Sequence, residues 1–96
     1  MLVGLNVTDD EAYRSYRAGM TPLLEGIGGG FGYDFKISEV LRSETEAPIN
    51  RLFTIYFPSE DAMQAFFEDA NYGEIKRRFF EGAVTDTTIL AEYRRT

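Results

Sequence analysis

The order of apolar and polar residues along this chain predicts four strands separated by two helical regions. Met1–Val7 carries apolar residues at every second position, which is the period of a strand with one buried face. Phe31–Arg42 alternates most clearly, and Arg51–Phe57 is rich in the aromatic and β-branched residues that favour strands. A last alternating stretch, Thr85–Tyr93, predicts the fourth strand.

The first helix is expected over about residues 9–26. Thr8 and Glu11 have the spacing of a capping box, in which two side chains satisfy free backbone N–H groups at a helix start. Apolar residues then recur at helical spacing, namely Tyr13, Tyr16, Met20, Leu23, Leu24 and Ile27. Pro22 is expected to bend or interrupt this helix, because proline lacks the N–H donor that a helix interior uses.

The second helical region is expected from Glu60 to about Gly82. Pro58 cannot donate to a central strand ladder and Ser59 is a good N-cap, so the chain should leave the sheet here and begin a helix. Residues 71–73 include Asn71 and Gly73 and predict a break in the helix.

A cluster of glycines, Gly26, Gly28–Gly30 and Gly32, separates the first helix from the second predicted strand. A dinucleotide-binding fingerprint needs a strand, then glycines, then a helix, whereas here the order is reversed. No Gly-Lys-Ser/Thr follows for a phosphate-binding loop. The cluster therefore indicates a turn that ends a helix and uses backbone angles open to glycine.

The predicted order β-α-β-β-α-β is typical of a ferredoxin-like α+β fold, with a four-stranded antiparallel sheet and helices on one face. Residues 43–50 are polar, include Pro48, and predict the connection between the second and third strands. Because 96 residues suit one compact core, we expect a single domain over 1–96.

Composition narrows the function classes. The formal charge of −6 disfavours nucleic acid and anionic lipid partners. The chain has no cysteine and no histidine, which removes the usual transition-metal ligands and the commonest general base, so we expect no metal and no cofactor. No run approaches the ~18 apolar residues of a membrane helix, and no leader pattern is seen, so we expect a cytoplasmic protein without a membrane partner.

A phenol and a guanidinium come close together at Tyr72 and Arg78, on the segment that the predicted break interrupts. With Tyr16 and Tyr33 they form our candidate ligand-binding set, since such groups suit a carboxylate or enolate ligand. The alternative is that these side chains anchor a helix end and fill the core. Arg51 reads as a strand-edge charge rather than a ligand clamp. No catalytic residue is predicted.

Several local motifs together resemble an uncharacterised family of domains of unknown function in the dimeric α/β-barrel superfamily. They are a helix with Tyr16 and Pro22, Gly29-Gly30 opening a strand, Phe57-Pro58-Ser59 entering a helix, Phe66-Phe67, and Tyr72 followed by an arginine. The resemblance implies a homodimer whose two sheets face each other as a barrel, with a cleft in each subunit. Superfamily relatives include cofactor-free monooxygenases and lactone isomerases, some of which rely on histidine, which this chain lacks.

Two classes of function stay open. The first is a cofactor-free enzyme or ligand-binding protein for a small, aromatic or acidic compound, and the second is a non-catalytic dimeric module that binds a protein partner. A pocket with convergent polar groups would favour the first, and a filled cleft the second. A homodimer is expected in both, because the second and fourth strands carry apolar residues for both faces of the sheet.

Overall fold

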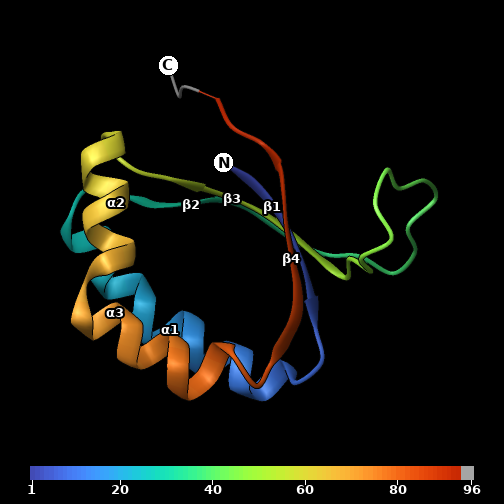
Figure 1. Ribbon diagram of the computed structural model, residues 1–96, viewed down its shortest axis with the longest axis horizontal. Coiled ribbons are helices and arrows are strands. Elements are labelled where there is room, and N and C mark those ends of the chain that lie inside the picture. The colour runs from blue at the N-terminus through green and yellow to red at the C-terminus, as the bar shows by residue number, and fades with distance from the viewer. Residues whose placement is uncertain (94–96) are drawn as a thin grey trace.

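The computed structural model describes residues 1–93, which form a four-stranded sheet, three α-helices and one π-helical turn (Figure 1). In chain order these elements are β1 (Leu2–Val7), α1 (Asp10–Gly26), β2 (Gly30–Lys36), β3 (Arg51–Tyr56), α2 (Glu60–Glu68), α3 (Ala70–Ile75), η1 (Lys76–Phe80) and β4 (Val84–Ala91). The predicted element order is confirmed, with the second helical region divided into α2, α3 and η1.

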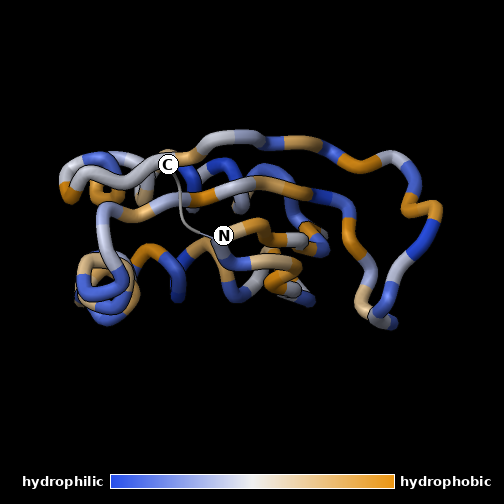
Figure 2. The backbone as a smooth tube through the Cα atoms, turned by 90° about the horizontal axis from the view of Figure 1, so that it is seen from above, coloured by the Kyte–Doolittle hydropathy of each residue, from blue (hydrophilic) through white to orange (hydrophobic). Residues whose placement is uncertain are grey.

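The sheet has the strand order β2-β3-β1-β4, and every neighbouring pair is antiparallel. The α+β class and the four-stranded antiparallel sheet are confirmed, and the arrangement fits a ferredoxin-like fold. Figure 1 shows the helices gathered on one side of the sheet and the loop of residues 37–50 projecting from the far end of β2 and β3. Figure 2 shows hydrophobic stretches on that projecting loop as well as on the strands.

The N-cap of α1 is Asp9 rather than Thr8, because the Asp9 side chain accepts from the backbone N–H of Ala12. The Thr8 backbone N–H and hydroxyl instead both donate to the Ala83 carbonyl oxygen, so the expected capping box does not form. Pro22 lies inside α1 without interrupting it. The helix ends where Gly28 takes a positive φ of 87°, a conformation that glycine adopts without strain.

The predicted break in the second helical region is observed at Asp69, two residues before the expected position. Asp69 has extended backbone angles, and its side chain accepts from the N–H groups of Asn71 and Tyr72, so it begins α3. Ser59 caps α2 as predicted by accepting from the Ala62 N–H.

Two strands end earlier than the alternation indicated. β2 stops at Lys36 instead of Arg42, because its partner strand begins at Arg51, opposite Lys36. β4 covers Val84–Ala91 instead of Thr85–Tyr93, because Ala91 is already paired with the first residue of β1. Alternation continues beyond the last ladder partner, so it cannot locate a strand end by itself.

The core lies between the sheet and the helices. The buried apolar residues are Val3, Leu5, Tyr13, Tyr16, Met20, Leu24, Phe53, Ile55, Phe66, Tyr72, Ala83 and Val84. Arg51 also faces this side, since it is paired with buried Leu5, and its side chain is 11% exposed. The expectation of a strand-edge charge was wrong, because Arg51 donates to Asp10 at 2.9 Å and its guanidinium stacks over the Tyr13 ring.

The opposite side of the sheet, which we call the outer face, is covered by none of the helices of residues 1–93 (Figure 1). The strand register puts Leu2, Gly4, Thr54, Leu52 and Phe35 on it. Ile49 and Leu90 side chains approach Gly4 so closely that a Cβ there would meet them at 2.9 and 3.1 Å. The outer face is therefore lined with apolar side chains in contact with solvent.

Candidate functional site

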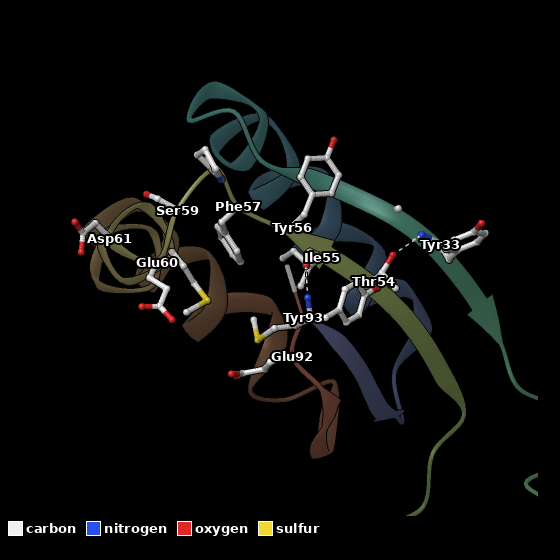
Figure 3. A pocket seen from close by; sticks show the side chains of 14 residues that line it. Tyr33, Thr54, Ile55, Tyr56, Phe57, Ser59, Glu60, Asp61, Glu92 and Tyr93 are labelled. Carbon is white, nitrogen blue, oxygen red and sulfur yellow. Dashed lines mark hydrogen bonds between the residues drawn. The ribbon is translucent and has the colours of Figure 1, made fainter. Parts of the chain in front are cut away.

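A hollow of about 960 Å³ lies at the end of the sheet where β3 leaves toward α2. Its wall includes the outer-face residues Tyr33, Thr54 and Tyr56 and, on the helix side, Phe57 and Met63 (Figure 3). We call it the β3–α2 hollow. Its lining residues come from both sides of the sheet end.

Two local features explain why the hollow forms here, namely the turn at Pro58 and Ser59 and a shift in the β2–β3 register. Pro58 and Ser59 turn the chain out of the sheet and begin α2, which places the first turn of that helix beside the strand end. Between Phe31 and Asp34 the β2–β3 register shifts, and the Tyr33 N–H donates to the Thr54 hydroxyl at 2.7 Å. The shift leaves Tyr33 projecting from the outer face at the end of the hollow away from α2 (Figure 3).

The side chains that line the hollow carry negative charge only. Glu60, Asp61 and Glu92 contribute three carboxylates, and no lysine or arginine among residues 1–93 lines it. Met1 also lines the hollow, and its positively charged amino group donates to the Ile55 carbonyl oxygen at 2.8 Å. Aromatic rings of Tyr33, Tyr56, Phe57 and Tyr93 make up much of the remaining wall. Carboxylates beside aromatic faces suit a neutral or positively charged aromatic compound better than an anion.

Tyr16 and Tyr72 meet in the core, away from this hollow. Their hydroxyl oxygens are 2.9 Å apart, and the residues are 6% and 5% exposed. Phe80 packs on the Tyr16 ring at 4.8 Å and Phe66 on the Tyr72 ring at 4.7 Å. Burial raises the pKa of both phenols above the ordinary value of 10.0, so both are neutral at physiological pH. Among the described residues the space around the pair is filled by rings.

Arg78 is exposed, with its guanidinium 5.0 Å from the centre of the Phe79 ring. Glu74, one helical turn before it, pairs with Arg77. Of the four candidate residues, the structure brings Tyr16 and Tyr72 into contact, puts Tyr33 on the hollow and leaves Arg78 on the surface. Their roles in ligand binding stay predictions.

Arg17 is a structural residue that sequence reasoning missed. It donates to the Tyr13 hydroxyl at 2.8 Å and to the Asp34 carboxylate at 3.2 and 3.3 Å. Its guanidinium also stacks 3.9 Å from the Phe31 ring centre. Tyr13 lies one helical turn before Arg17 on α1, but Asp34 and Phe31 lie on β2, and no local signal indicated the contacts to that strand.

Sequence reasoning also missed the β3–α2 hollow, because its lining residues come from segments that are far apart in the chain. Pro58, where the chain leaves the sheet, is the one local feature that marks its position. A second hollow of about 310 Å³ lies beside Asp10, Lys36 and Arg51, whose charges already pair with one another.

The part of the chain that the structure describes, residues 1–93, lacks two kinds of feature. Within them, no group of three or more histidine, cysteine, aspartate or glutamate side chains is arranged to hold a metal ion. None of their helices has the length and apolar character needed to cross a membrane.

Comparison with known proteins extends the sequence resemblance. The family described as "Domain of unknown function (DUF1330)" matches residues 1–93. A crystal structure of a protein of unknown function from Rhodopseudomonas palustris, RPA0582, is similar with a TM-score of 0.77 and 21% identity over 91% of this chain and 74% of that one. Its methylated form gives a TM-score of 0.76 and 20% identity over 91% and 73%. At this identity the likeness concerns the fold alone. No curated protein is similar enough to count as a match.

Proposed function

The chain belongs to the family of domains of unknown function DUF1330, and from this premise we propose that it is a homodimer that binds a small molecule in the β3–α2 hollow of each subunit. In this dimer the outer faces of two sheets meet and form a dimeric α/β barrel. The cytoplasmic location expected from the sequence stays a prediction.

The outer face supports the dimer. Tyr33, Phe35 and Leu90 are 67%, 50% and 48% exposed, and the rings of Tyr33 and Phe35 stack on each other with centres 5.9 Å apart. Contiguous exposed apolar side chains mark interaction surfaces on soluble proteins. Light scattering at micromolar concentration should give twice the chain mass of 10.9 kDa, and the single-chain mass would refute the dimer.

The ligand-binding part of the proposal rests on the size and lining of the β3–α2 hollow. Its volume of about 960 Å³ falls within the ~300–1,000 Å³ of small-molecule sites, and apolar rings and polar groups share its wall. The three carboxylates favour an aromatic amine, so the earlier expectation of an acidic compound gives way to a neutral or cationic one. We assign no catalytic residue, because no nucleophile or general base is singled out in the wall.

Methionine methyl groups give a direct test of binding. The chain has three methionines: Met1 and Met63 line the hollow, whereas Met20 is 1% exposed in the core. In NMR spectra of protein labelled with ¹³C at the methionine methyls, millimolar benzylamine should shift Met63 and leave Met20 unchanged. Benzoate should act more weakly, because the carboxylates repel it. If neither compound shifts Met63, the hollow does not bind such ligands.

The core around Tyr16 and Tyr72 favours a second candidate, the non-catalytic dimeric module. Aromatic rings pack around the two bonded hydroxyls there, as expected for a filled core rather than for a pocket with convergent polar groups. A dimer whose Met63 signal responds to no small molecule would support this reading instead.

A further inference from the structure

We infer that the second hollow binds a small oxyanion, a phosphate or a carboxylate group, through the side chains of Arg51 and Lys36. This goes beyond the proposed function, because it concerns the other end of the sheet and a ligand of opposite charge. The hollow lies where the loop of residues 37–50 leaves β2 and returns to β3 (Figure 1). We call it the Arg51 hollow, and its lining residues are Val7, Asp10, Lys36, Ile37, Asn50 and Arg51.

The guanidinium of Arg51 is buried but only partly bonded. Arg51 is the one charged residue among residues 1–93 that is buried, with 9% of its surface exposed. A guanidinium has five N–H donors, and the structure gives those of Arg51 one acceptor, a carboxylate oxygen of Asp10 at 2.9 Å. No buried side-chain nitrogen in this part of the chain lacks a partner, so the other N–H groups of Arg51 reach solvent. Because Arg51 lines the hollow, these N–H groups can donate to an anion there.

Lys36 places a second cation beside the first. It is the register partner of Arg51 across β2 and β3, so the two side chains are neighbours on the same face of the sheet. Like charges directly opposite each other on neighbouring strands destabilise the sheet, and a negative charge between them relieves the repulsion. Asp10 supplies one such charge, since Arg51 donates to one of its oxygens and Lys36 to the other at 3.4 Å.

Asp10 does not compensate all the positive charge in contact with it. Arg14 also lies 3.1 Å from its carboxylate, so three cations share one negative charge. Asp9, Glu11 and the glutamates of the 37–50 loop offset the surplus at longer range, but none of them lines the hollow. An anion is therefore held by direct contact with the donors rather than by a long-range field, and we expect affinity in the millimolar range.

The remaining polar groups of the wall decide the class of ligand. The Asn50 side chain accepts from the Val7 N–H and donates to the Val7 carbonyl oxygen, both at 2.8 Å, so it is already bonded. The oxygens of Asp10 are occupied by the three cations. The unused groups are donors on Arg51 and Lys36, which suit the oxygens of an oxyanion. The volume of about 310 Å³ is at the lower end of the ~300–1,000 Å³ of ligand sites, which favours a small compound.

Titration with sodium phosphate, with sodium chloride keeping the ionic strength constant, tests the inference. In ¹H–¹⁵N NMR spectra phosphate should shift the Arg51 side-chain Nε signal and the backbone amides of Lys36 and Ile37 in a saturable way. A parallel titration with sodium acetate identifies the source of the oxyanion. Stronger binding of phosphate assigns the site to phosphate groups, and stronger binding of acetate assigns it to carboxylates. If neither anion gives saturable shifts at tens of millimolar, the Arg51 hollow is not an anion site.

The chain has two lysines, which give a matched pair of variants. Lys36→Gln removes one of the two cationic donors at an exposed position and should weaken phosphate binding about fivefold. Lys76→Gln makes the same change on η1, outside the hollow, and should leave the Kd within about twofold. Equal effects would mean that phosphate responds to the total charge of the chain, which would overturn the site. Arg51 is the less clear test, because its guanidinium packs over the Tyr13 ring and its replacement would also disturb the core.

Asp10→Asn tests whether the carboxylate competes with the anion for the same donors. The asparagine has a similar shape and no charge, so phosphate should bind about threefold more tightly or better. Weaker binding would show that the carboxylate is needed to hold Arg51 and Lys36 in place, and would overturn the bridge between them. These results do not depend on benzylamine binding near Met63, because the two hollows lie at opposite ends of the sheet.

Discussion

Replacing Tyr72 with phenylalanine is expected to destabilise the fold through the hydroxyl that it leaves behind. The hydroxyls of Tyr16 and Tyr72 are bonded at 2.9 Å, and no buried side-chain oxygen or nitrogen among the described residues lacks a partner. Tyr72→Phe removes one hydroxyl and leaves that of Tyr16 buried without its partner. Tyr16→Phe does the reverse, so both single variants leave an unpaired polar group.

The magnitude follows from the burial of the pair. An unsatisfied buried hydroxyl costs about 1–3 kcal/mol, whereas replacing both partners by apolar groups of the same shape is nearly neutral. The double variant Tyr16→Phe/Tyr72→Phe should therefore be more stable than the sum of the single changes implies, with a coupling energy of about 1–2 kcal/mol. Each kcal/mol corresponds to about 4–8 °C in Tm for a domain of this size.

Urea unfolding followed by circular dichroism measures these differences. All variants must be compared at one protein concentration, because dimerisation makes apparent stability depend on concentration. Tyr93→Phe is the matched control: the residue is 60% exposed and follows the end of β4, so the same chemical change should stay within about 0.5 kcal/mol.

Two results would refute the reasoning. Single variants as stable as the Tyr93→Phe control would mean that the buried hydroxyls contribute nothing to folding. Strictly additive single and double changes would mean that Tyr16 and Tyr72 act independently. If Tyr72→Phe kept its stability and instead lost ligand binding, the sequence-based prediction of a ligand contact would be supported.

Alkaline pH should also destabilise the protein, since burial raises the pKa of Tyr16 and Tyr72 in the folded state above their unfolded value of 10.0. The folded state then keeps protons that the unfolded state releases, so stability is complete below about pH 10 and falls as the pH rises further. In the double phenylalanine variant the urea midpoint should fall less steeply with rising pH than in the unchanged protein. Gly29→Ala should cost about 1–3 kcal/mol in thermal unfolding, because a Cβ would lie 2.7 Å from a main-chain oxygen at the end of β3. Gly26→Ala, where a Cβ meets nothing within 4 Å, should instead stabilise by about 0.4–1 kcal/mol, and equal effects would contradict the close approach. Arg17→Lys should lower the free energy of unfolding in urea by about 1–3 kcal/mol, because an ammonium cannot reproduce the bonds of the planar guanidinium to α1 and β2 together. An unchanged urea midpoint would show that the guanidinium of Arg17 is dispensable.

Local pattern determined the order of the elements. Alternation marks a strand with one buried face, and helical spacing marks a stripe such as Tyr13, Tyr16 and Met20, all of which are buried. Short-range chemistry also located the Ser59 cap and the glycine turn at Gly28, because each involves residues no more than a few positions apart. The ferredoxin-like order of strands and helices was predictable for this reason.

Strand ends and caps needed the tertiary structure. Thr8 has the right chemistry for an N-cap, but its N–H and hydroxyl donate to the carbonyl oxygen of Ala83, far along the chain. Asp9 caps the helix instead. Likewise β2 ends at Lys36 because β3 offers no further partner. In both cases a distant residue decides between local alternatives that the sequence presents as equal.

The candidate site depended on tertiary structure most of all. Tyr16 and Tyr72 are 56 residues apart and Arg17 and Asp34 are 17 apart, yet each pair is bonded. The β3–α2 hollow likewise joins the start of the chain, two strands, a helix and the segment after β4. The sequence by itself determined which residue types were available and on which element each would lie. Which of them meet was decided by the packing of the sheet against its helices, because contacts between distant segments exist only once the chain has folded.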